Sequence, residues 1–253
     1  GDYMRLRCLG SSSSGNCYLL ENDRECLVLE AGLPLKEVKK ALDFNISKIV
    51  GLLVTHEHGD HCKYVKEFYE TGIDIRMSLG TADNMDAEFL TVRIVKSGFW
   101  YQLGGFTITP FPVVHDAAEP FGYIIRHQDI GTLLFASDTE YIKLNFRKLQ
   151  LNHIMIECNY SQKIIDSRLR QGDTDKMLRD RVLQSHMELE TCKEFIRQNK
   201  TPMLDNIILL HLSDGNSNQK QFIHEIQEVA GPFVRVYAAD KGLTVNLDVI
   251  PFM

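Results

Sequence analysis

Short apolar runs alternate with turn-forming segments along the first fifty residues. The runs at 4–9, 17–21 and 26–29 have the length of strands, and a polar loop at 10–16 and a charged turn at 22–24 separate them. From Leu35 to Leu42 the apolar side chains recur at helical spacing, and Pro34 suits the first turn of a helix. The continuous apolar run at 49–54 is typical of a strand buried on both faces. The pattern predicts a strand meander, a helix and a buried strand.

The same alternation continues to the end of the chain. Helical spacing recurs up to Gly72 and over 81–89, 188–198 and 217–229, and the segment 161–181 is highly charged. Strand-like runs lie at 92–95, 106–109, 121–126, 132–135, 154–157, 206–210, 233–238 and 243–249. No Pro-, Gly- or Ser-rich linker and no repeat of fixed period divides the sequence. We therefore expect a single α+β domain over residues 1–253, with two sheets packed face to face and helices outside.

Charge and composition narrow the possible partners. The chain has 28 basic and 34 acidic side chains, a formal net charge of -6. This balance argues against a main role in binding long nucleic acids, which needs many Lys and Arg contacts to phosphate, although a local basic groove stays possible. No stretch approaches the roughly 20 apolar residues of a membrane span, and no signal peptide opens the chain, so we expect a cytoplasmic protein without a membrane partner. Six cysteines without a CxxC pair favour free buried thiols over disulfides.

A dense cluster of metal-binding side chains follows the buried strand at 49–54. His56, His58, Asp60 and His61 lie within six residues. Imidazole and carboxylate together suit zinc or another first-row divalent ion. A polar loop with chance histidines is the alternative, and the density of the cluster argues against it. The helical HExxH pattern is absent, because the fourth residue after His56 is Asp60.

Three further candidate ligands also follow apolar runs. His115 comes after 112–114, Asp138 after 132–136 and His211 after 206–210. Each alone is better explained as a capped turn or an edge histidine. Because all of them leave a strand in the same way, they could gather on one edge of a sheet sandwich and complete the site.

In this order the motifs resemble the metallo-β-lactamase superfamily, and within it the dinuclear phosphodiesterase branch that includes ribonuclease Z. The resemblance implies a four-layer αββα sandwich and two divalent metal ions, Zn²⁺ as the first choice and Mn²⁺ as the alternative. Asp at position 138, where the lactamases typically have Cys, favours phosphoester over lactam chemistry. By resemblance, one metal would be held by His56, His58 and His115, the other by Asp60, His61 and His211, with Asp138 bridging the two.

A closer likeness concerns four segments, 10–16, 55–61, 115–123 and 185–190. They resemble the YycJ/WalJ-like subgroup, which includes bacterial nucleases and which in turn resembles the phage anti-Pycsar phosphodiesterases. The compact chain and its acidic balance favour the small-substrate enzymes. We therefore expect hydrolysis of 3′,5′-cyclic mononucleotides such as cCMP, cUMP, cAMP and cGMP to nucleoside monophosphates, by a homodimer that would lie in the host cytoplasm if phage-encoded.

Other functions stay open beside this one. The first alternative is a YycJ/WalJ-like nuclease acting on single strands or DNA ends, and only this alternative makes nucleic acid a partner. A metal-binding scaffold without turnover, and hydrolysis of lactams or thioesters, are weaker alternatives. Strong salt dependence of oligonucleotide binding would separate a nuclease from a small-substrate enzyme.

The resemblance to ribonuclease Z also implies a proton donor. It places a histidine at the start of a late helix, paired with a glutamate at the end of a preceding strand, and His186 and Glu157 match these positions. His186 would protonate the leaving oxygen, and Glu157 would orient it and keep it partly protonated. The alternative is that His186 only caps the helix that follows. Asp60 completes the expected catalytic set, and Asp116 and Glu119 are candidates to orient His115.

The Gly-flanked polar turn at 10–16 leaves a choice between two roles. Its backbone N–H groups could surround a phosphate oxygen or the outer shell of the metals, as such turns often do. A plain flexible turn is equally consistent with its residues.

Overall fold

The computed structural model describes residues 3–85 and 92–249. The chain separates into two compact units. The first comprises Gly1–Pro112, Ala117–Gly131 and Ala239–Met253, and the second comprises Val113–Asp116 and Thr132–Ala238. The expectation of one domain over residues 1–253 stays a prediction. No helix within 3–85 and 92–249 combines the length and the apolar character that crossing a membrane requires.

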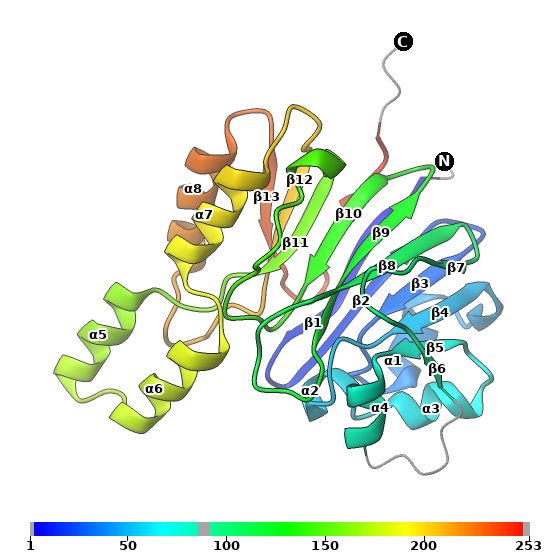
Figure 1. The fold of residues 1–253 in the computed structure, drawn as a ribbon, viewed down its shortest axis with the longest axis horizontal. Coiled ribbons are helices and arrows are strands. Elements are labelled where there is room, and N and C mark those ends of the chain that lie inside the picture. Colours follow the sequence, from blue (N-terminus) through cyan, green and yellow to red (C-terminus); the bar gives the residue numbers. More distant parts are fainter. Residues whose placement is uncertain (1–2, 86–91, 250–253) are drawn as a thin grey trace. The chain divides into compact units, whose positions relative to one another are not determined.

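A seven-stranded mixed sheet forms the centre of the first unit (Figure 1). Its strand order is β14-β1-β2-β3-β4-β5-β6; β14, β1, β2 and β3 pair antiparallel, and β3 to β6 pair parallel. The strands are β1 (Arg5–Ser12), β2 (Gly15–Glu21), β3 (Cys26–Leu29), β4 (Ile49–Leu53), β5 (Ile75–Met77), β6 (Arg93–Ile94) and β14 (Thr244–Asn246).

Helices cover one face of this sheet. Leu19 and Val28 of the sheet share a buried core with Val38 of α1 and Phe68 of α3. The helical segments of this unit are α1 (Leu35–Ala41), η1 (Ile46–Lys48), α2 (Gly59–Cys62), α3 (Val65–Glu70) and α4 (Leu79–Asn84). An antiparallel set of three strands, β7 (Tyr101–Leu103), β8 (Phe106–Pro112) and β9 (Phe121–His127), completes the unit.

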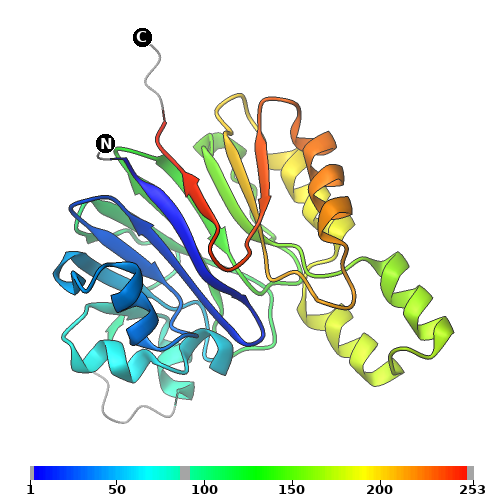
Figure 2. The same ribbon diagram turned by 180° about the vertical axis from the view of Figure 1, so that it is seen from behind.

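Parallel strands form the centre of the second unit. They are β10 (Gly131–Ala136), β11 (His153–Glu157), β12 (Asn206–Leu210) and β13 (Arg235–Ala238). Helices α7 (Leu189–Asn199) and α8 (Gln219–Ala230) lie on one face of these strands, as both views show (Figures 1 and 2). The short η2 (Arg147–Leu149) and the hairpin of α5 (Gln162–Gln171) and α6 (Lys176–Ser185) complete the unit. The second sheet has the order β13-β12-β11-β10-β9-β8-β7, so the expected α+β class with two sheets and flanking helices is confirmed.

The sequence pattern did not predict strands β5 and β7, and the structure differs from it in three further segments. Strand β1 continues to Ser12 and β2 begins at Gly15, so most of the expected loop at 10–16 is a hairpin whose backbone groups are satisfied by strand pairing. The charged segment 161–181 folds as two helices, with Gly172 in the left-handed region after α5 and Asp175 capping α6. The helix expected over 81–89 corresponds to α4 at its start, and its remainder falls at 86–91, outside the described residues.

Candidate metal centre

The carboxyl ends of β3 and β4 bring a buried acid beside the histidine-rich segment. The two strands are parallel neighbours with Leu29 opposite Leu53, so the residues that follow them meet at one edge. Glu30 is fully buried there. Its carboxylate accepts hydrogen bonds from the backbone N–H of Thr55 (2.8 Å), from the Thr55 hydroxyl (3.0 Å) and from His61 Nδ1. Sequence analysis missed Glu30, although an acid that directly ends an apolar strand run is a usable signal.

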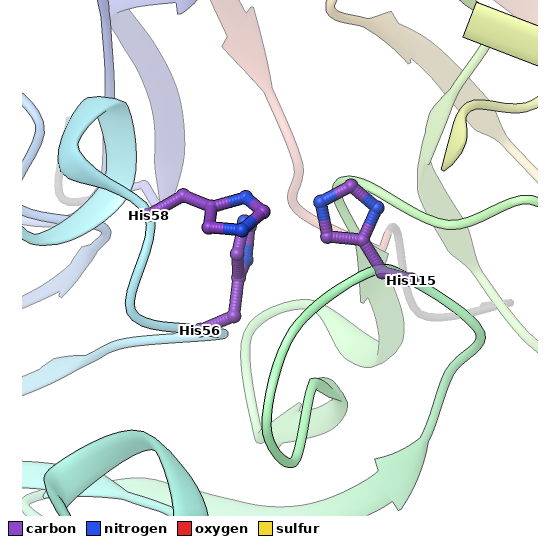
Figure 3. A group of neighbouring side chains, drawn as sticks. All are labelled: His56, His58 and His115. Atoms are coloured by element: carbon purple, nitrogen blue, oxygen red, sulfur yellow. The ribbon is translucent and has the colours of Figure 1, made fainter. Parts of the chain in front are cut away.

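The segment 56–61 folds back on itself through one turn of helix. The His58 carbonyl accepts from the backbone N–H groups of His61 (2.9 Å) and Cys62 (3.1 Å), which starts α2. The rings of His56 and His61 lie 4.2 Å apart between centroids. The rings of His56 and His58 meet edge to face (Figure 3), with their centroids 4.6 Å apart. Glu30, His56 and His61 each place a donor atom within 4.8 Å of the others.

Hydrogen bonds fix the imidazole tautomers in this segment. The Thr55 hydroxyl donates to Glu30, so it accepts from Nδ1–H of His56, at 2.8 Å. Nδ1–H of His61 donates to the Glu30 carboxylate. In both rings the proton therefore lies on Nδ1, which leaves the Nε2 lone pair for a metal, as the carboxylate–histidine–metal arrangement requires. Burial raises the pKa of Glu30, and its contacts with His61 and Thr55 oppose that rise.

The second unit gathers its candidate ligands in the same way. Ala136 of β10 lies opposite Ile156 of β11, and Glu157 lies opposite Leu210 of β12, so Asp138, Glu157 and His211 leave parallel strands at one edge. These three side chains and His186 place donor atoms within 4.8 Å of one another.

His211 has an unusual backbone conformation for a histidine. Its φ is 55°, in the left-handed region that side chains other than glycine adopt at a cost. The Asn159 side chain donates to its carbonyl at 2.8 Å and holds it there. Nδ1 of His211 lies 3.3 Å from both Asp138 Oδ1 and Glu157 Oε1. The turn thereby directs the ring at the two buried acids.

Glu157 and His186 form the expected pair. His186 Nδ1 lies 2.5 Å from Glu157 Oε1, while Glu157 Oε2 accepts from the backbone N–H groups of Thr139 (2.9 Å) and Met187 (3.1 Å). His186 follows α6, and the residue that caps α7 is Glu188, whose carboxylate accepts from Glu190 N. The alternative reading of His186 as the cap of that helix is therefore wrong.

His115 is oriented by a main-chain acceptor. Its Nδ1–H donates to the Ser185 carbonyl at 2.7 Å, and its Nε2 lies 3.7 Å from Asp138 Oδ2. The Glu119 carboxylate accepts from Gly80 N at 2.7 Å, and its expected role toward His115 stays a prediction. Burial lowers the pKa of His115 against the opposing charge of Asp138, which favours the neutral imidazole that a metal ligand must be.

The structure thus assembles the predicted residues in two groups. The first unit holds His56, His58 and Asp60 with His61, and the second holds His115, Asp138, Glu157, His186 and His211. Figure 3 shows that His56 and His58 come from the segment after β4 and that His115 comes from the segment between β8 and β9. Neutral imidazole nitrogens and carboxylate oxygens are a donor set that suits divalent metals. The division of these residues between two ions stays a prediction.

Comparison with known proteins finds similarity to one superfamily and to two of the curated proteins. The sequence profile described as "Metallo-beta-lactamase superfamily" matches residues 12–79. The chain is 28% identical to the exodeoxyribonuclease YycJ of Bacillus anthracis, over 96% of this chain and 92% of that protein. It is also 28% identical to the exodeoxyribonuclease WalJ of Streptococcus pneumoniae, over 85% of this chain and 84% of that protein.

The solved structures agree at the level of the fold. The metallo-β-lactamase fold protein YhfI from Bacillus subtilis superimposes with a TM-score of 0.74 at 15% identity, and the match covers 97% of this chain and 100% of that one. The two mixed sheets with flanking helices are those of the same fold. This chain has the metallo-β-lactamase fold.

Proposed function

We propose that the chain is a phosphodiester hydrolase that works with two divalent metal ions, Zn²⁺ first and Mn²⁺ as the alternative. The observation that carries this proposal is the pairing of His186 with the buried Glu157 beside His211 and Asp138. Metal ligands alone would serve many hydrolytic reactions. A protonatable histidine next to them, held by a carboxylate, provides the proton that an alkoxide leaving group needs.

The proposed ligand sets follow the order of the motifs. His56, His58 and His115 would hold one ion, Asp60, His61 and His211 would hold the other, and Asp138 would serve both. The hydrogen bonds at Nδ1 of His56, His61 and His115 support this assignment, because each places the proton on Nδ1 and makes Nε2 the unprotonated nitrogen that a metal requires. Bound there, two divalent ions supply Lewis-acid chemistry at a phosphoryl group and lower the pKa of a water molecule.

The chain's own residues supply the remaining chemistry. Glu157 Oε1 accepts a hydrogen bond from Nδ1–H of His186. This bond orients the ring and stabilises its charged form, so the ring can transfer the proton on Nε2 to the leaving oxygen. The backbone donors Thr139 N and Met187 N fix the other oxygen of Glu157, so the carboxylate cannot rotate away. Asp60 contributes negative charge that partly offsets that of the ions.

For the substrate we propose 3′,5′-cyclic mononucleotides. Such a substrate carries one phosphodiester and needs no extended basic surface, which agrees with a net charge of -6. Two of the four arginines of the α5–α6 hairpin are engaged in local contacts. Arg168 donates to Asn216 and to the Asp173 carbonyl, and Arg179 pairs with Asp166 and Asp180.

A second candidate is a nuclease acting on single strands or DNA ends. The observation in its favour is the likeness to YycJ and WalJ, two proteins named as exodeoxyribonucleases, over most of the chain. Under this candidate, oligonucleotide binding would weaken steeply as salt is raised, whereas turnover of a small cyclic nucleotide would change little.

One experiment decides between them. Metal-analysed protein is incubated with cAMP, cGMP, cCMP, cUMP, bis(p-nitrophenyl) phosphate, and single- and double-stranded DNA oligonucleotides. Nucleoside monophosphate formed from cyclic mononucleotides is the expected product. Turnover of oligonucleotides alone would replace the first candidate with the second, and turnover of neither class would overturn the phosphodiesterase proposal. Homodimerisation and a cytoplasmic location stay predictions, the first of which light scattering would check.

A further inference from the structure

The tip of the β1–β2 hairpin contains a buried asparagine that faces the α2 ligands. Asn16 is 1% exposed. Its side-chain nitrogen lies 3.3 Å from Asp60 Oδ2 and 3.3 Å from His61 Nε2, and it also lies within hydrogen-bond distance of the main-chain carbonyls of Ser12 (3.0 Å) and Asp60 (3.2 Å). Both Asp60 and His61 belong to the proposed ligand set.

The orientation of this amide is fixed from behind. The Tyr18 hydroxyl lies 3.4 Å from Asn16 Oδ1, to which it can donate, and 2.6 Å from Ser11 Oγ. Tyr18 is fully buried in the sheet. The carbonyls of Ser12 and Asp60 and the Asp60 carboxylate can only accept hydrogen bonds, so the NH₂ group faces them and Oδ1 faces the Tyr18 hydroxyl.

The backbone around Asn16 is packed tightly against α2. Gly32 N donates to the Asn16 carbonyl at 2.9 Å. A Cβ added to Gly32 would lie 1.8 Å from the Asp60 carbonyl oxygen and 2.5 Å from Asn16 N, so only glycine fits between the hairpin and α2. Gly15 has φ 148° and an added Cβ there would lie 2.5 Å from the Gly32 carbonyl oxygen. The glycines of both segments permit this close approach.

From these contacts we infer that Asn16 is a positioning residue, which holds the Asp60 carboxylate in the orientation that binds a divalent metal ion; its contact with His61 Nε2 is the one that an ion bound to that nitrogen would replace. The inference rests on the proposed ligand set. The amide holds Oδ2 of the Asp60 carboxylate. Ser11 and Tyr18 complete the chain of hydrogen bonds that keeps the amide in place. The polar hairpin tip therefore supports the metal ligands rather than forming a flexible turn.

The test is a metal titration of the full-length chain. Zn²⁺ is added to EDTA-stripped, dialysed protein in competition with a chromophoric chelator. The variants are Asn16→Ala, which removes the amide, and Tyr18→Phe, which removes only the hydroxyl. Asn45→Ala is the matched control, because Asn45 is exposed and its side chain bonds only locally, accepting from Ser47 Oγ. Circular dichroism melting of the metal-free proteins reports folding separately.

Asn16→Ala should weaken one of two binding steps about 10- to 100-fold, as is usual for groups that orient metal ligands. Tyr18→Phe should weaken the same step less, and Asn45→Ala should leave both steps unchanged. The inference would be overturned if both zinc-binding steps of Asn16→Ala had the wild-type affinity. It would also be overturned if both steps lost affinity equally and the metal-free variant melted at a lower temperature.

The outcomes for the inference and for the proposed function are distinguishable. If the wild type binds zinc but hydrolyses no phosphodiester, the proposed function fails. The zinc titration then still tests the role of Asn16. If the wild type binds a single equivalent of zinc, weaker zinc binding by Asn16→Ala supports the inference. Unchanged zinc binding by that variant overturns it. If the wild type binds no metal, both fall.

Discussion

Each unit contains one buried glutamate that orients candidate metal ligands of that unit. Glu30 and Glu157 are both fully buried, and each accepts from backbone N–H groups as well as from at least one histidine. A buried carboxylate is stable only when donors surround it. The histidines that it fixes thereby acquire one tautomer and one direction, so these acids carry much of the site's preorganisation.

Replacing Glu30 with glutamine tests the first of these. The change keeps the size of the side chain but presents an NH₂ group where two oxygens now accept hydrogen bonds. We expect Glu30→Gln to lower zinc affinity about 10- to 100-fold in a chelator competition. Glu70→Gln, at an exposed position of α3, is the control, and equal affinities in the two variants would show that Glu30 does not orient His61.

Replacing His186 with alanine tests the proton donor. Turnover should fall about 10²- to 10⁴-fold, the usual contribution of general acid catalysis. The metal content should stay that of the wild type, measured by inductively coupled plasma mass spectrometry. His224→Ala, on the exposed face of α8, controls for loss of an imidazole. Loss of bound metal in His186→Ala would mean that His186 is a ligand instead.

At the scale of the elements, the candidate ligands lie at the carboxyl ends of parallel strands. A threonine connects the ends of β10 and β11 in the second unit. Thr139 follows Asp138, and its hydroxyl lies 3.1 Å from Val114 N and 2.8 Å from the Tyr141 carbonyl. Its own N–H donates to Glu157. Thr139 therefore links the segment that holds His115 to the ends of β10 and β11.

We expect Thr139→Val to destabilise the fold, because Val114 N loses its hydroxyl acceptor inside the protein. The loss should be about 1–3 kcal/mol in urea unfolding, the cost of leaving a buried polar group unsatisfied. Thr107→Val on β8 removes a hydroxyl that bonds only Gln102 at the surface and should cost less. Equal losses in the two variants would contradict the linking role of Thr139.

A pH-dependent ion cluster connects β1, β2 and η1. The buried Glu21 at the end of β2 pairs with Arg5 and Arg7 of β1 and with Lys48 of η1, at 3.1, 3.0 and 2.6 Å. Burial alone would raise the pKa of Glu21, but the hydrogen bonds and charges of Lys48, Arg7 and Arg5 outweigh it and lower the pKa below its usual value.

The sign of the pH effect follows from the lowered pKa. The stabilisation by Glu21 is complete above the unfolded-state value of about 4.3 and disappears as the pH falls through the lower folded-state pKa. In urea unfolding, the wild type should therefore exceed Glu21→Gln in stability at neutral pH, and the difference should shrink below about pH 4. A difference that stays constant down to pH 2 would rule this out.

At the scale of the whole molecule, metal removal should lower thermal stability. Zinc at about a thousand times its dissociation constant adds roughly 4 kcal/mol to the folded state. For a chain of this size that corresponds to a rise in Tm of roughly 8–16 °C. Melting with zinc and with excess EDTA measures it, and identical melting temperatures would exclude a site of useful affinity in the folded state.

Much of the molecule follows from local patterns in the sequence. The apolar run at 206–210 is β12 with the same bounds, and the helical spacing after Pro34 is α1. The candidate ligands were recognisable because His56, His115, Asp138 and His211 each follow an apolar run, and parallel strands bring such positions together. Composition and spacing are local properties, so the sequence alone determined the fold class, the residue types of the site and its position at strand ends.

Tertiary structure decided which partners those residues have. Glu30 and His61 are 31 positions apart, and His115 and Ser185 are 70 apart, so no local pattern reveals that one orients the other. The sequence at 10–16 predicts a loop, because serine and glycine have weak strand propensity. In the structure this segment forms a hairpin, because its two strands pair with each other and pack closely on Gly32. Tautomers, side-chain orientation and the support of the ligands depend on contacts between distant segments, and these exist only once the chain has folded.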